Sequence, residues 1–215
     1  MQLLLIRHGS NDWIGTRLAG WTPGVHLNDL GRAEASALAA RLAGRPLHAV
    51  YASPLERARE TAAFVAAPHG LPVRTLPEVG EVRFGSWEGR ALEELRADPL
   101  WERVQRHPSG TRFPGGESLA DVQARAVAAL DGLAARHPRE VVAVVSHADV
   151  IKAAVAHYAG AHLDHFQRLV VAPASLCVIH LSDGEPRLVL FNDSGALPPP
   201  PAAADAEPDA AGAHA

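Results

Sequence analysis

A short apolar run close to the first residue ends directly in an arginine, a histidine and a glycine. Residues 3–9 read Leu-Leu-Leu-Ile-Arg-His-Gly, and the run has no helical period, so it predicts a buried strand that opens into a loop. In open parallel sheets, the ligand crevice lies beyond the carboxyl ends of the strands. We therefore expect Arg7 and His8 at the rim of such a crevice.

Further apolar runs alternate with helical patterns along the chain. Strands are predicted at 48–52, 73–75, 141–145, 176–181 and 187–191, and helices at 29–43, 54–67, 91–106, 118–136 and 150–158. The branched apolar residues at 141–145 are typical of a strand that is buried on both faces. The alternation of strands with longer helices predicts a layered α/β domain whose sheet is mostly parallel.

Residues with capping side chains indicate where helices begin and end. Asn28 is expected to cap the helix at 29–43, and Gly44 to terminate it. Ser53 is expected to cap the next helix, with Pro54 in its first turn. These signals place the second helix directly after a strand.

Length and composition favour one globular domain. The chain has 215 residues, 47% of them hydrophobic, which is enough for one sizeable core. We expect the domain to span 1–197 and the Pro/Ala-rich tail at 198–215 to be disordered, because the tail offers nothing to bury. The single cysteine, Cys177, lies in an apolar stretch and is expected to be a buried structural thiol.

Charge and hydropathy argue against several classes of partner. The formal net charge is -4 and no basic stripe is present, so no nucleic-acid partner is expected. No apolar run approaches the length of a membrane span, and the first residues do not resemble a secretory leader. We therefore expect no membrane partner and a cytoplasmic location.

Three predicted strand ends bring together side chains that suit one anion. The first strand ends in Arg7 and His8. The helix after the second strand carries Arg57 in its first turn, and the strand at 141–145 leads to His147. A neutral imidazole can attack phosphorus, a guanidinium can hold the oxygens of the attacked group, and a helix N-terminus favours anions. The sequence therefore predicts a phosphate pocket that needs no metal.

Five short motifs stand in order along the chain. They are Arg-His-Gly at 7–9, Ser-Pro-Leu-Glu-Arg-Ala-Arg-Glu-Thr at 53–61, Glu-Val-Arg-Phe-Gly-Ser-Trp-Glu-Gly at 81–89, Pro-Gly-Gly-Glu-Ser at 114–118 and Ser-His at 146–147. Together they resemble the histidine phosphatase superfamily, also called phosphoglycerate mutase-like, from residue 3 to about 192. The resemblance implies a three-layer α/β/α sandwich, with residues 90–116 as an insertion over the active site.

The resemblance also implies a role for each reactive residue. His8 is the expected nucleophile. Arg7, Arg57 and His147 would bind the equatorial oxygens of the phosphoryl group and offset its charge. Glu81 matches the family's proton donor, which protonates the departing alkoxide and then activates a water molecule. The neighbouring arginines favour a neutral His8, whereas His147 works best as a cation, which a bound dianion would favour. No cofactor is implied.

Each of these residues also has an ordinary structural interpretation. Arg57 could be a helix-surface arginine, and His147 could be a hydrogen-bonded histidine at a strand end. Glu81 has acidic neighbours, Glu78 and Glu88, in a charged loop that could simply face solvent. The match of its surroundings to Phe-Gly-x-Trp-Glu-Gly favours Glu81 as the proton donor.

Two positions depart from the family pattern. Ile14 stands where many relatives have an asparagine that donates to phosphate, so Asn11 or Ser10 is expected to supply that donor. Ala148 stands where a glycine often follows the second histidine. We expect Ala148 beside the substrate, where its methyl group narrows the approach to the pocket.

Three activities fit such a pocket. A mutase must hold phosphohistidine until a phosphorylated acid rebinds, which requires extra basic groups and a cover that excludes water. The insertion contains Arg96, Arg103, Arg106 and Arg112 but lacks the paired-arginine pattern of the glycolytic relatives. We therefore favour a phosphomonoesterase acting on a small phosphorylated metabolite, over a phosphoglycerate mutase and over a phosphate-binding regulatory module without turnover. Whether the chain forms a homodimer is left open.

Overall fold

Six strands form one sheet in the order β3-β2-β4-β1-β5-β6 in the computed structural model, which describes residues 1–181 and 185–195. The strands are β1 (Gln2–Arg7), β2 (Ala49–Ala52), β3 (Val73–Thr75), β4 (Val141–Ser146), β5 (Leu176–His180) and β6 (Arg187–Asp193). Strands β3, β2, β4 and β1 pair in parallel, whereas β5 is antiparallel to both of its neighbours. The predicted, mostly parallel sheet is confirmed.

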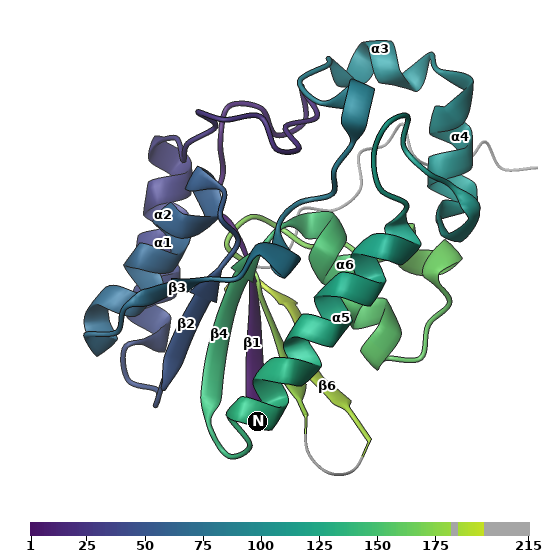
Figure 1. Ribbon diagram of the computed structural model, residues 1–215. Helices are drawn as coiled ribbons and strands as arrows, with labels where there is room; N and C mark the ends of the chain where they lie inside the picture. Colours follow the sequence, from purple (N-terminus) through teal and green to yellow (C-terminus); the bar gives the residue numbers. More distant parts are fainter. Residues whose placement is uncertain (182–184, 196–215) are drawn as a thin grey trace, which may run out of the picture.

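Helices cover both faces of this sheet (Figure 1). They are α1 (Asp29–Leu42), α2 (Glu56–Ala66), α3 (Leu92–Arg96), α4 (Pro99–Arg106), α5 (Leu119–Arg136) and α6 (Ala148–Tyr158). Because side chains alternate along a strand, Leu4 and Ile6 of β1 face the core shared with α1 and α2, while Leu3 and Leu5 face the core shared with α5 and α6. The fold is therefore the predicted three-layer α/β/α sandwich.

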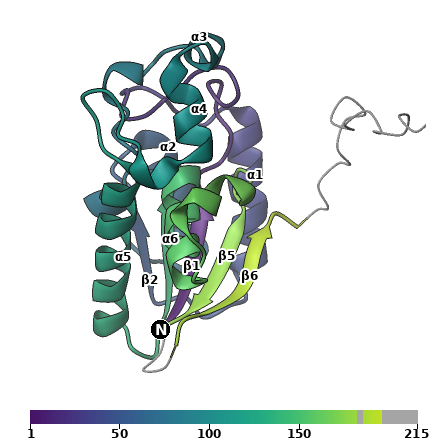
Figure 2. The ribbon, with the colours of Figure 1, turned by 90° about the vertical axis from the view of Figure 1, so that its right-hand side faces the viewer.

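The insertion at 90–116 builds a separate small core above the carboxyl ends of the strands, as Figure 2 shows for α3 and α4. Leu95, Val104 and Phe113 are buried there against neighbouring apolar side chains. The prediction of a single helix at 91–106 is wrong, because the chain forms two helices there, α3 and α4. Asp98 accepts a hydrogen bond from the backbone N–H of Leu100 and begins α4 as a new helix.

The start of α2 also differs from the prediction. Ser53 does not cap α2, because the helix begins at Glu56 and Leu55 occupies the cap position without a side-chain hydrogen bond. The hydroxyl of Ser53 instead lies 2.8 Å from Nε2 of His147. This serine therefore supports a histidine rather than a helix.

Two other helix ends can be compared with their predicted signals. Asn28 caps α1 as expected, since its side chain accepts from the backbone N–H of Gly31. Helix α1 ends at Leu42 with Ala43 as its cap residue, so it stops directly before Gly44, as expected. Helix α6 begins at Ala148, two residues earlier than predicted.

Several expectations concern the rest of the chain. Residues 196–215, which include the tail expected to be disordered, lie outside the described residues, so the boundary at 197 stays a prediction. Cys177 is buried and forms no disulfide, as expected. Among the described residues, no helix combines the length and the apolar character needed to cross a membrane.

Two glycines let the loop after β1 touch helix α1. A Cβ atom on Gly31 would lie 2.0 Å from the carbonyl oxygen of Ser10, and one on Gly9 would lie 2.5 Å from the carbonyl oxygen of Gly31. Real side chains do not tolerate such distances, so this close approach of backbones requires glycine. The contact positions the loop that carries His8.

We expect Gly31→Ala to destabilise the protein by about 1 to 3 kcal/mol, because the added methyl group overlaps the backbone of Ser10. Chemical denaturation measures this as a lower midpoint with an unchanged m-value. Gly132→Ala is the control, because Gly132 lies inside α5 and its Cβ would meet the flexible end of Arg136 at 3.4 Å. Equal stability of Gly31→Ala and wild type would contradict the close contact.

Candidate active site

Strands β1 and β4 place two histidines side by side. The strands pair in parallel with Arg7 opposite Ser146, so the residues that follow them, His8 and His147, emerge at the same edge of the sheet. The centroids of the two imidazole rings lie 5.1 Å apart. Residues separated widely in the sequence therefore share one site because their strands are neighbours.

Arg57 lies between the two histidines. It comes from the first turn of α2 and is only 1% exposed. Its Nε lies 3.3 Å from Nε2 of His8, and its Nη2 lies 3.3 Å from Nδ1 of His147. The same Nη2 donates to the carbonyl of Gly20 at 2.9 Å. Arg57 is thus a buried part of the site and not a helix-surface arginine.

The hydrogen bonds determine which ring nitrogens carry protons. A guanidinium only donates, so Nε2 of His8 and Nδ1 of His147 both accept from Arg57. In the neutral rings, Nδ1 of His8 donates to the carbonyl of Gly9 at 2.7 Å, and Nε2 of His147 donates to the hydroxyl of Ser53. The lone pair on Nε2 of His8 is therefore directed into the site.

Burial and positive charge keep both imidazoles neutral. Burial, and then the charges of Arg57 and Arg7, lower the pKa of His8 well below its ordinary value. Burial and Arg57 likewise lower the pKa of His147 well below that of a solvated imidazole. A neutral His8 is what nucleophilic attack requires. The cationic form expected of His147 depends on the negative charge of a bound dianion.

Two guanidinium nitrogens point to an anion. Nε of Arg7 and Nη1 of Arg57 are buried and have no hydrogen-bond partner in the described part of the chain. Nη1 of Arg7 donates to the carbonyl of Val171 at 2.6 Å, which fixes the side chain. Buried cationic donors without partners are costly, so a ligand with several anionic oxygens would stabilise this arrangement.

A cavity of about 150 Å³ opens beside these residues and is lined by Arg7, His8, Arg57, Glu81, Asn11 and Ala148, among others. His147 is fully buried and does not line the cavity, so it is linked to the cavity through Arg57, which does. Ala148 lies beside the space available to a substrate, as expected. Across residues 1–181 and 185–195, no group of three His, Cys, Asp or Glu residues could hold a metal ion.

Glu81 is the acidic residue of its loop that reaches the cavity. Its side chain is 13% exposed, and its Oε2 lies 3.7 Å from Nδ1 of His147. Its Oε1 accepts from the backbone N–H of Val82 at 2.9 Å. Burial, and then the charge of Asp149, raise the pKa of Glu81 to about 7. A carboxyl group with this pKa can both donate and accept a proton near neutral pH.

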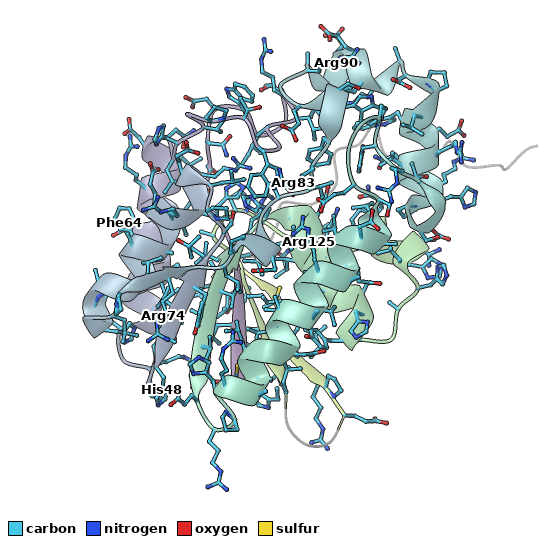
Figure 3. All side chains as sticks on the ribbon, viewed as in Figure 1. His48, Phe64, Arg74, Arg83, Arg90 and Arg125 are labelled. Atoms are coloured by element: carbon cyan, nitrogen blue, oxygen red, sulfur yellow. The ribbon has the colours of Figure 1, made fainter. Side chains whose placement is uncertain are left out.

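Arg125 of α5 holds the loop that carries Glu81 (Figure 3). It donates to the carbonyls of Gly80 at 2.8 Å and Glu81 at 3.0 Å. It also pairs with the carboxylate of Glu117 at 2.8 Å, and Glu117 accepts from the backbone N–H of Arg83 at 2.9 Å. Arg125 could not be predicted from the sequence, because an arginine within a long amphipathic helix gives no local signal of such contacts.

Of the two candidates for the missing phosphate donor, the structure favours Asn11. The hydroxyl of Ser10 donates to Glu34 at 2.9 Å, and Ser10 does not line the cavity. Asn11 lines it, and its Oδ1 accepts from the backbone N–H of Trp13 at 3.0 Å, which leaves the amide nitrogen for a ligand. Ile14 lies at the rim and is 37% exposed.

A parallel sheet whose adjacent strand ends hold two histidines around a buried arginine defines a class of enzymes that process phosphate esters. The sequence profile of the histidine phosphatase superfamily (branch 1) matches residues 3–194. The chain belongs to this superfamily and is a phosphomonoesterase within it.

Relatives with known names and structures are similar along most of the chain. The chain is 31% identical to phosphoserine phosphatase 1 of Hydrogenobacter thermophilus, over 85% of this chain and 88% of the relative. Among solved structures, YhfR of Bacillus stearothermophilus has a TM-score of 0.84 and 31% identity, over 89% of this chain and 96% of that one. The structure of mycobacterial glucosyl-3-phosphoglycerate phosphatase in complex with VO3 has a TM-score of 0.81 and 29% identity, over 89% of this chain and 98% of that one. These structures share the phosphoglycerate mutase-like fold.

We expect Arg125→Gln to lower kcat at least tenfold, because it releases the backbone that positions Glu81. Inhibition by inorganic phosphate is expected to depend on Arg7 and Arg57 and should change little. Arg136→Gln, an exposed position at the end of the same helix, is the control and should alter neither quantity. An Arg125→Gln variant with wild-type kcat would show that the loop does not need this contact.

Proposed function

We propose that this chain hydrolyses phosphate monoesters without a metal ion, through a phosphohistidine intermediate on His8. One observation carries the proposal. The lone pair on Nε2 of His8 lies beside Arg57, and both Arg7 and Arg57 keep a buried nitrogen available for the oxygens of an anion. This is the arrangement that in-line transfer of a phosphoryl group to an imidazole requires.

In the first step, the lone pair on Nε2 of His8 exchanges its hydrogen bond with Nε of Arg57 for an attack on phosphorus, while the bond between phosphorus and the ester oxygen breaks. Arg7 and Arg57 bind the phosphoryl oxygens and offset the charge of the transition state. Glu81 transfers its proton to the departing alkoxide, so that the alcohol leaves as a neutral molecule. The carbonyl of Gly9, which accepts from Nδ1, stabilises the positive ring of phosphohistidine.

In the second step, water attacks phosphorus on the side opposite His8. The carboxylate of Glu81 takes a proton from this water, and the bond between phosphorus and nitrogen breaks. The electron pair returns to Nε2 of His8, inorganic phosphate leaves, and Glu81 is again protonated. His147 contributes by holding Arg57 through Nδ1.

The insertion supports hydrolysis over mutase activity. Its five arginines, Arg90, Arg96, Arg103, Arg106 and Arg112, do not line the cavity. Arg106 pairs with Glu102 and Arg112 pairs with Asp121. The insertion therefore does not supply the cavity with the extra cations that a mutase needs around a phosphorylated acid.

The size of the cavity favours a small ester. Its volume of about 150 Å³ is below the range of roughly 300 to 1,000 Å³ that is usual for sites of drug-sized ligands. The relatives named above carry the names of phosphatases for phosphoserine and for glucosyl-3-phosphoglycerate. We infer a small phosphorylated metabolite as substrate.

We expect His8→Ala to lose hydrolysis of phosphate monoesters by on the order of a thousandfold or more, because the nucleophile is removed. After rapid quenching, wild type incubated with a labelled phosphate ester should carry label that survives alkali and is lost in acid, as a phosphoramidate does. His69→Ala removes an imidazole outside the cavity and should retain both activity and label. Full activity of His8→Ala would exclude the covalent mechanism.

The pKa of Glu81 near 7 predicts opposite pH dependences for the two steps. The group acts as an acid only when protonated, so the burst of alcohol release should fall as pH rises above about 7. It acts as a base only when ionised, so hydrolysis of the intermediate should fall as pH drops below about 7.

Glu81→Gln tests this assignment by rapid-mix kinetics. The variant should lose the burst with alkyl phosphates but keep much of it with p-nitrophenyl phosphate, whose leaving group needs no proton. Equal losses with both esters would show that Glu81 does not protonate the leaving group.

A further inference from the structure

One carboxylate in the cavity is not explained by phosphate chemistry. Asp149, in the first turn of α6, lines the same cavity as Arg7 and Glu81, and its side chain is 27% exposed. A fixed negative charge here repels a phosphate dianion and opposes ionisation of Glu81. An acidic residue near a helix N-terminus is favourable in itself, but that benefit does not require it to face an anion-binding cavity.

Neighbouring side chains hold Asp149 in place. Nζ of Lys152 lies 3.2 Å from its Oδ1. Lys152 in turn donates to Gln167 at 2.9 Å and lies 4.5 Å from the centre of the Phe166 ring. Oδ2 of Asp149 has no hydrogen-bond partner within the described residues, so it can accept from a ligand in the cavity.

We propose that Asp149 binds an ammonium group on the alcohol portion of the substrate and thereby selects O-phosphorylated amino acids of the phosphoserine type. The inference rests on the proposed function, because Arg7 and Arg57 must hold the phosphoryl group for the alcohol to lie near Asp149. An ammonium group gives Oδ2 a charge-assisted hydrogen bond and offsets the repulsion between carboxylate and phosphate. A hydroxyl group at the same carbon forms a weaker bond and leaves that repulsion in place.

The rim of the cavity carries a positive charge, on Arg17, that suits the carboxylate of an amino acid. Nη1 of Arg17 donates to the carbonyl of Gly89 at 2.9 Å, and the guanidinium lies 5.8 Å from the centre of the Trp13 ring. The other guanidinium nitrogens of Arg17 make no hydrogen bond with residues that the structure describes, and the residue lines the cavity. Asp149 and Arg17 therefore offer opposite charges to the ammonium and the carboxylate of one substrate.

Three esters that differ at a single carbon test the proposal with the full chain. O-phosphoserine, 3-phosphoglycerate and O-phospho-3-hydroxypropanoate carry NH3+, OH and H on the same carbon, and share the phosphate and the carboxylate. Phosphate release gives kcat/KM for wild type, Asp149→Asn and Asp149→Glu. Asp131→Asn is the matched control, because Asp131 binds the hydroxyl of Tyr158 outside the cavity. Thermal unfolding checks that each variant is folded.

We expect wild type to prefer O-phosphoserine over O-phospho-3-hydroxypropanoate at least tenfold, with 3-phosphoglycerate in between, as a charge-assisted hydrogen bond implies. Asp149→Asn should lower this ratio to near one. Asp149→Glu keeps the charge and should retain part of the preference, and Asp131→Asn should retain all of it.

Two results would overturn the role of Asp149. One is a wild-type enzyme whose kcat/KM is about equal for O-phosphoserine and O-phospho-3-hydroxypropanoate, or which turns over other phosphate monoesters but none of these three. The other is an Asp149→Asn variant that changes kcat/KM equally for all three esters, which would show that Asp149 acts on Glu81 and not on the substrate. Failure of the proposed function is distinct, because wild type would then hydrolyse no monoester at all, p-nitrophenyl phosphate included.

Discussion

The active site depends on the contacts that the buried guanidinium of Arg57 makes with two imidazole rings, those of His8 and His147. Its nitrogens contact both imidazoles, and a protonated imidazole would face a like charge at 3.3 Å. Each ring is therefore neutral and has one tautomer, with the lone pair of His8 directed into the site. The proton of His147 faces Ser53 and that of His8 faces a backbone carbonyl, so both rings are fixed in orientation. A single buried cation thus fixes the tautomers of both rings and keeps its own Nη1 without a partner in the described part of the chain.

The same burial has opposite effects on groups of opposite charge type. It lowers the pKa of both imidazoles and raises the pKa of Glu81, so neutral rings and a partly protonated carboxyl group are present together near neutral pH. This balance requires Glu81 to stay close to the arginines without forming a direct ion pair. Arg125 and Glu117 achieve this by holding the backbone of the loop rather than its carboxyl group. Hydrogen bonds to the loop backbone, and not extra charge in the cavity, therefore position Glu81.

Particular residues show how far the sequence could predict this site. The apolar runs before His8 and His147 indicated two buried strands, and parallel pairing of β1 with β4 then requires the two histidines to be neighbours. The helix cap predicted at Ser53 is wrong: serine before proline is a common helix-start signal, but the hydroxyl of Ser53 bonds to a histidine 94 residues away. Local signals describe what one segment can form. They do not reveal which residues of another layer will contact that segment.

The amino-acid sequence alone determined the periodicity of strands and helices, the α/β class, and the set of reactive side chains at the strand ends, because these depend on short-range patterns. Three features of the site follow from the packing of the layers and not from local patterns: Asn11 rather than Ser10 lines the cavity, His147 contacts it through Arg57, and Asp149 also lines it. The physical reason is that burial, hydrogen-bond partners and the pKa of each group depend on atoms from distant segments, which are brought together only when the layers pack.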